Sequence, residues 1–87
     1  MYLHIGDDFV IPFRDVVGIF DLDNTTTTAA GRKFIRDAEK KGSVITVGDA
    51  LPKSYIICNN VFGSTIFISP ISSSTLLKRA EKLQLNF

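Results

Sequence analysis

The chain has 87 residues, of which 45% are hydrophobic and 22% charged, a composition that excludes a disordered protein and predicts one small domain over residues 1–87. Its net charge of +1 does not by itself define a class of partner. Cys58 is the only cysteine, which excludes an internal disulfide. The N-terminus does not resemble a signal peptide and no apolar run approaches the ~20 residues of a membrane span, so we expect a cytoplasmic protein without a membrane partner.

Strands are predicted wherever short apolar or β-branched runs occur along the chain. A turn at Gly6-Asp7-Asp8 separates the first two, Pro12 ends the second, and the segment from Asn59 to Gly63 joins the last two as a hairpin. The predicted strands are residues 2–5, 9–11, 16–20, 44–47, 54–58 and 64–69.

Two amphipathic helices are predicted from the spacing of apolar residues. A threonine of the run 25–28 caps the first helix, and Gly42 ends it. One of the serines 72–74 caps the second helix, which follows Pro70. The expected apolar stripes are Ala30, Phe34, Ile35 and Ala38 in the first helix, and Leu76, Leu77, Ala80 and Leu83 in the second. The opposite face of the second helix is expected to carry Lys78, Arg79 and Lys82.

These elements predict an α+β fold with a mixed or antiparallel sheet of about five to six strands and two helices. The strands at 54–58 and 64–69 are apolar on nearly both faces, and such strands must be covered twice. Two short helices cover about one face, so the other face needs either another subunit or a sheet that curls onto itself. Of these two we expect a homo-oligomer. The expected interface residues are Tyr55, Ile57 and Phe67.

The charges are distributed unevenly along the chain. Residues 1–26 carry five aspartates and one arginine, whereas residues 27–87 carry nine lysines or arginines and four acids. Such asymmetry fits a basic face for nucleic acid, complementary faces that join subunits, or ordinary solvated surfaces. The sequence leaves these three interpretations open.

One local motif points to an enzyme. The run Asp21-Leu22-Asp23-Asn24-Thr25 after an apolar strand resembles the first motif of the haloacid-dehalogenase-like phosphatases, in which Asp21 would be the nucleophile and Asp23 the acid/base, beside Mg²⁺. The alternative is a strand that leaves the sheet through turn residues into a capped helix. The chain has room for one clear crossover of the parallel sheet that such enzymes need, so we predict a protein that is not an enzyme and has no metal or cofactor.

Four blocks of the chain, residues 1–8, 14–21, 52–54 and 69–80, are similar to the RemA/RemB family of small bacterial biofilm-matrix regulators, and more to its RemB branch. The resemblance implies a LytTR-like fold that assembles into rings. It also implies DNA binding and transcriptional regulation of extracellular-matrix genes in the RemA branch, with no enzyme activity and no cofactor.

The resemblance assigns DNA contacts to Arg14 and to Lys53. Other positions of the basic cluster before the later strand hold Ala50, Leu51 and Pro52 here. The basic residues of the first helix, Arg32, Lys33 and Arg36, are further candidates for phosphate contacts or are a solvated face. Two hypotheses follow: an oligomeric regulator that binds DNA mainly through its backbone, and an adaptor that partners a RemA-type protein without strong DNA binding.

Overall fold

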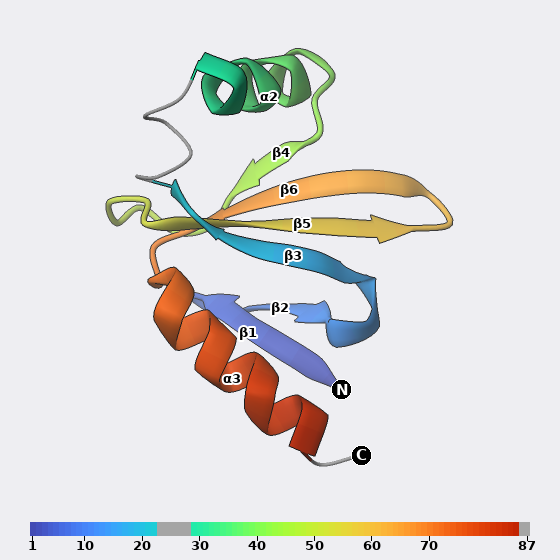
Figure 1. The fold of residues 1–87 in the computed structure, drawn as a ribbon, viewed down its shortest axis with the longest axis vertical. Helices are drawn as coiled ribbons and strands as arrows, with labels where there is room; N and C mark the ends of the chain where they lie inside the picture. The colour runs from blue at the N-terminus through green and yellow to red at the C-terminus, as the bar shows by residue number, and fades with distance from the viewer. Residues whose placement is uncertain (23–28, 86–87) are drawn as a thin grey trace.

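The computed structural model describes residues 1–22 and 29–85, in which each of two α-helices follows a group of three strands (Figure 1). The elements are β1 (Tyr2–Gly6), β2 (Phe9–Pro12), the 3-10 helix η1 (Phe13–Asp15), β3 (Val16–Asp21), α2 (Ala29–Lys40), β4 (Val44–Thr46), β5 (Ser54–Asn60), β6 (Gly63–Ser69) and α3 (Ser73–Leu85). The predicted α+β class, with strands and two helices in this order, is confirmed.

The strands form two sheets instead of the one sheet suggested by the sequence. β3, β5, β6 and β4 lie in this order in a mixed sheet, in which β4 runs parallel to β6 and the other pairs are antiparallel. β1 and β2 pair with each other and with no other described strand. The separation arises because the apolar side chains of this hairpin are buried against a face of the larger sheet, so the hairpin does not extend the sheet edge.

The core lies between the β1–β2 hairpin, the four-stranded sheet and α3. Leu3 and Ile5 of β1 are almost fully buried in one cluster with Ile56 of β5 and Leu76 of α3. Burying each such side chain contributes roughly 1.5–3 kcal/mol. The protomer thus covers this sheet face with its own N-terminal hairpin, which removes part of the reason for expecting a second copy there.

Two buried serines connect the hairpin and the chain after β6 to the sheet. Ser69 donates to the carbonyl of Ile5 at 2.5 Å and accepts a hydrogen bond from the N–H of Ile71 at 3.0 Å. Ser54 donates to the carbonyl of Ile71 at 2.7 Å. Both serines are inaccessible to water. Water therefore cannot replace these hydroxyls as hydrogen-bond partners of the buried backbone groups.

The opposite face of the sheet carries an aromatic pair. Phe20 of β3 stacks on Tyr55 of β5 with ring centroids 5.0 Å apart. The ring of Phe20 also lies over Gly18, where an added Cβ atom would come within 2.6 Å of it. A side chain at residue 18 would therefore displace the ring from this face.

The ends of the helices follow the predicted signals where the structure describes them. Gly42 has a φ of +70° after α2, and the N–H groups of Gly42 and Ser43 donate to the carbonyls of Glu39 and Ala38, which is a Schellman motif. Ser72 is the serine that caps α3, because its hydroxyl accepts from the N–H of Thr75 at 3.3 Å. The predicted threonine cap of α2 lies outside the described residues.

Several side chains of the helices depart from the predicted stripes. In α2 the side chain of Ile35 is buried, whereas Ala30 and Phe34 are exposed, because this helix packs against the short edge strand β4. In α3 the side chain of Leu77 is exposed. Arg79 was expected on the open face of α3 but is partly buried, because its guanidinium donates to the carbonyl of His4 at 3.0 Å and ties α3 to β1.

Replacing Ser69 by alanine tests the connection between the two sheets. The Ile5 carbonyl and the Ile71 N–H would remain buried without their partner, so we expect the free energy of unfolding to fall by about 1–3 kcal/mol. Urea titration measures this decrease. Ser64→Ala removes an exposed hydroxyl and should change stability by less than about 0.5 kcal/mol. Equal stabilities of the two variants would contradict the assignment.

The reactivity of Cys58 tests the burial of β5. Burial, with a smaller effect of the Asp15 carboxylate, raises the pKa of the Cys58 thiol from 9.0 to about 11. At pH 8 the folded protein should therefore react with a disulfide reagent about 100-fold more slowly than the unfolded chain. Stability should also fall as the pH rises above about 9, because the unfolded thiol ionises first. Equal labelling rates in buffer and in denaturant would contradict this.

Candidate nucleic-acid interface

Arg14 lies in η1, the link between the hairpin and the larger sheet. The N–H of Phe13 donates to the carbonyl of Met1 at 3.0 Å and fixes the start of this turn. The Arg14 side chain is 90% exposed, and its Nε lies 3.9 Å from Oδ1 of Asp15, a weak contact at the surface. The guanidinium is therefore held on an ordered turn and open to a phosphate group.

Lys53 lies immediately before β5 and is exposed. Its backbone is fixed on both sides, because its N–H donates to the carbonyl of Ser69 and its carbonyl accepts from the N–H of Leu22. The antiparallel register pairs Ser54 with Asp21 at one end of β3 and Cys58 with Val16 at the other. Arg14, which precedes Val16, is thus separated from Lys53 by roughly 14 Å or more of strand. The structure does not bring these two cations together within one protomer.

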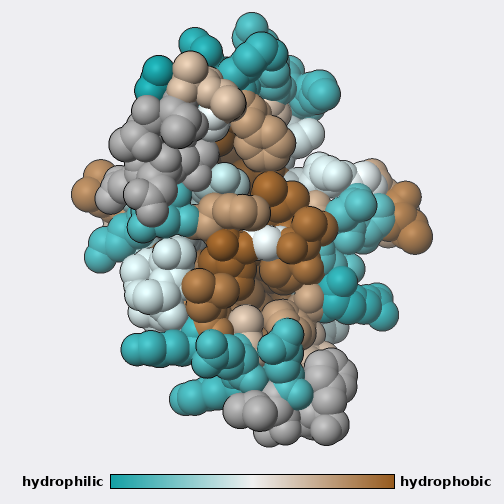
Figure 2. Space-filling view, in the orientation of Figure 1, coloured by the Kyte–Doolittle hydropathy of each residue, from teal (hydrophilic) through white to brown (hydrophobic). Residues whose placement is uncertain are grey.

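The cations of α2 form a third group. Helical spacing places Arg32, Lys33 and Arg36 on one exposed face, which borders the buried Ile35. Lys33 donates to a carboxylate oxygen of Asp37 at 2.8 Å, and this hydrogen bond lowers the pKa of Asp37. Figure 2 shows hydrophilic side chains gathered over α2, at the end of the molecule away from α3. This helix therefore offers positive charge on a surface distinct from that of Arg14.

The loop before Lys53 carries apolar residues. Leu51 is 78% exposed, and the flanking Ala50 and Pro52 supply no charge. An exposed leucine in this position cannot bind a phosphate, and its apolar surface is suited to contact with another protein.

The geometry around the Asp21 motif does not match the phosphatase resemblance. β3 is an edge strand of the sheet and its neighbour β5 is antiparallel, whereas the resemblance implies a strand within a parallel sheet. Asp23, the proposed acid/base, lies outside the described residues. Within residues 1–22 and 29–85, no group of three or more His, Cys, Asp or Glu side chains is placed to hold a metal ion.

The residues expected at a subunit interface lie on two different faces. Tyr55 is buried and stacked on Phe20, and Ile57 shares its face of the sheet. Phe67 lies on the other face and packs against Phe9 of the hairpin, with ring centroids 5.4 Å apart. Tyr55 and Phe67 thus take part in contacts within the protomer.

Sequence reasoning overlooked the tip of the β5–β6 hairpin. The predicted turn was longer, but β5 continues to Asn60 and β6 starts at Gly63, so Val61 and Phe62 alone form the tip. Their side chains are 93% and 95% exposed. Two consecutive apolar residues between turn-forming Asn and Gly were the signal in the sequence that could have revealed it.

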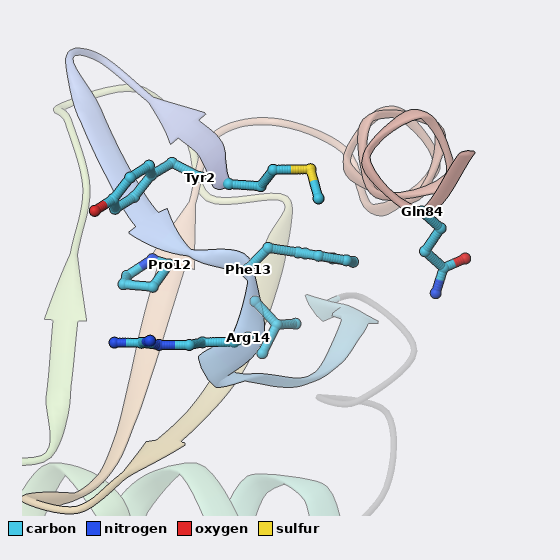
Figure 3. A pocket seen from close by; sticks show the side chains of 7 residues that line it. Tyr2, Pro12, Phe13, Arg14 and Gln84 are labelled. Carbon is cyan, nitrogen blue, oxygen red and sulfur yellow. The ribbon is translucent and has the colours of Figure 1, made fainter. Parts of the chain in front are cut away.

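A hollow of about 580 Å³ lies beside Arg14 (Figure 3). Phe13 points toward the helix that carries Gln84, whereas Arg14 and Tyr2 point to the other side with Pro12 between them (Figure 3). About half of its wall is apolar, and the wall comes from the start of the chain, the end of β2, η1, the first residue of β3 and the end of α3. The lining residues are Met1, Tyr2, Pro12, Phe13, Arg14, Val16 and Gln84.

Neither α2 nor α3 is long and apolar enough to cross a membrane, and the same holds for every helix in the described ranges.

Comparison with known proteins identifies the family. The chain is 40% identical over 81 residues to the extracellular matrix regulatory protein B of Bacillus subtilis (strain 168), an alignment that covers 93% of this chain and 91% of that protein. The family model described as extracellular matrix regulatory protein A-like matches residues 2–80. This chain therefore belongs to the RemA-like family of extracellular matrix regulatory proteins.

Proposed function

We propose that this protein is a cytoplasmic, oligomeric regulator of transcription that binds the DNA backbone and controls extracellular-matrix genes of biofilms without catalysing a reaction. Its family supplies the link to matrix regulation. The observation that carries DNA binding is the exposed cationic face of α2, formed by Arg32, Lys33 and Arg36. Arg14 and Lys53 add exposed cations at opposite ends of the β3–β5 pair.

The distribution of these cations explains why oligomerisation belongs to the proposal. Each phosphate contact adds only about 0.9 to the salt dependence of DNA binding, and affinity rises with the number of contacts. Arg14 and Lys53 are too far apart within a protomer to form one compact patch. Repeated copies along a duplex multiply weak contacts, because the second and later contacts form at a high effective concentration. A small protomer with dispersed charge then becomes an effective DNA ligand.

The exposed Leu51 favours a second candidate function. In this alternative the protein is an adaptor that binds a RemA-type regulator through apolar surface and contacts DNA weakly. The basic cluster of the RemA branch is replaced here by Ala50, Leu51 and Pro52, and the most exposed of these side chains is apolar.

A salt titration of DNA binding distinguishes the two functions. We expect fluorescence anisotropy with a labelled duplex to show affinity that falls steeply between about 50 and 200 mM salt. Arg14→Ala and Lys53→Ala should each weaken binding, and the salt slope should decrease by about 0.9 for every phosphate that the assembly no longer neutralises. The triple variant Arg32→Ala, Lys33→Ala, Arg36→Ala should show the weakest binding.

The matched control removes one exposed lysine from a different surface. Lys82→Ala on α3 changes the net charge as Lys53→Ala does and should leave the affinity and the slope nearly unchanged. If the wild-type protein binds no DNA even at the lowest salt, the adaptor function replaces the proposed one. If Lys82→Ala weakens binding as much as Lys53→Ala, the contact residues are assigned wrongly.

A further inference from the structure

The tip of the β5–β6 hairpin carries two exposed apolar side chains, although the turn itself could be formed by polar residues. Gly63 has a positive φ of +121°, whereas neither Val61 nor Phe62 has a positive φ, the backbone conformation that favours glycine or asparagine. Polar residues usually occupy such positions. Two adjacent side chains that are more than nine-tenths exposed thus form a small apolar projection, which we call the hairpin tip.

The hairpin tip is held in a defined geometry. The side-chain oxygen of Asn60 accepts from the N–H of Phe62 at 2.8 Å, and its amide nitrogen donates to Oδ2 of Asp15 at 3.4 Å. The Ser64 hydroxyl donates to the side chain of Asn59 at 3.3 Å. A preorganised projection loses little conformational entropy when it binds a partner.

The hollow beside Arg14 has the size and chemistry to receive such a projection. Its volume of about 580 Å³ lies within the range in which protein pockets enclose a small ligand, about 300–1,000 Å³. Met1, Pro12, Phe13 and Val16 supply apolar wall, which suits Val61 and the ring of Phe62. Arg14 at its border supplies a cation that can lie against the face of an aromatic ring.

We infer that the hairpin tip of one copy packs into the hollow of a second copy, and that this is the contact through which the protein assembles. The inference rests on the oligomeric form of the proposed function and names the surfaces that form it. Because the tip and the hollow are different parts of the chain, each copy offers one of each. Successive copies can therefore be joined by the same contact.

The charges near the hairpin tip favour a protein partner over DNA. An aromatic side chain at a hairpin tip is also suited to insertion between base pairs. Such insertion is supported by cations that hold the flanking phosphates, but the tip segment from Asn59 to Ser64 contains no basic residue. It also contacts the carboxylate of Asp15, which repels phosphate. The hollow, in contrast, offers the tip the apolar side chains of Met1, Pro12, Phe13 and Val16.

The contact would place the arginines of neighbouring copies near one another. The tip of one copy is bonded through Asn60 to Asp15, the residue after Arg14, and it would enter a hollow bordered by Arg14 of the next copy. Assembly would thus convert single exposed guanidinium groups into a row. DNA affinity should consequently depend on Phe62, although Phe62 itself contacts no phosphate.

A single tryptophan at the tip tests the contact directly, because the chain contains no tryptophan. In the full-length Phe62→Trp variant, the emission maximum should shift to shorter wavelength as the protein concentration rises from about 1 µM to about 1 mM, since the ring leaves water for the hollow. Leu51→Trp, which is also highly exposed but distant in sequence from the tip, should show no shift. A shift produced only by added DNA, without assembly, would overturn the inference in favour of base insertion.

Mixing two defective variants provides the second test, with sedimentation velocity as the measurement. Phe62→Ser lacks the tip ring, and Tyr2→Asp places a charge at the mouth of the hollow; both residues are exposed, and circular dichroism checks that each variant is folded. Each variant alone should remain monomeric. A one-to-one mixture retains one intact tip and one intact hollow, so it should form a mixed dimer and nothing larger.

The outcomes separate this inference from the proposed function. If Phe62→Ser assembles like the wild-type protein and still binds DNA, the tip contact is refuted while the regulator function stands. If the wild-type protein is monomeric at about 1 mM, the contact is refuted whatever the DNA titration shows. If Phe62→Ser does not assemble and also binds DNA more weakly than the wild-type protein, the tip contact and the regulator function are both supported.

Discussion

The apolar seam between the β1–β2 hairpin and the four-stranded sheet is the interaction on which the remaining structure depends. The two sheets share no backbone ladder among the described strands, so their relative position is fixed by Leu3, Ile5 and Ile56, by α3, and by the Ser69 hydroxyl. η1 connects the two sheets, and it carries Arg14 and part of the hollow. The seam therefore determines where the candidate DNA contact and the candidate assembly surface lie.

Much of the local structure could be predicted from the sequence because local structure follows from short patterns. The strands, the Gly42 helix end and the serine cap of α3 each depend on a few neighbouring residues. The position of the separate β1–β2 hairpin could not be predicted in the same way. The sequence of an apolar strand does not indicate which distant segment packs on it. The partial burial of Arg79 has a similar origin, since its partner His4 lies 75 residues away in the chain.

The candidate site shows the same division. Arg14 and Lys53 were identified from a family resemblance, but their separation follows only from the antiparallel register of β3 and β5. The segment from Asn59 to Gly63 predicts a hairpin connection, but its sequence does not show that Val61 and Phe62 alone form the exposed tip. Dispersed cations on one protomer, an apolar projection and an apolar hollow are separate features of one small chain. The proposed contact between copies would give all three a common role.

The seam also has a consequence for how the protein folds. Each hairpin joins residues that are close along the chain, whereas the Ser69 hydrogen bond joins residues separated by 64 positions. Closing a loop of that length costs roughly 4 kcal/mol of chain entropy, and the apolar contacts that offset this cost form only when the hairpin docks. Docking is thus expected to be the late step in folding. Arg14 and the hollow would then become ordered last, together with the junction that supports them.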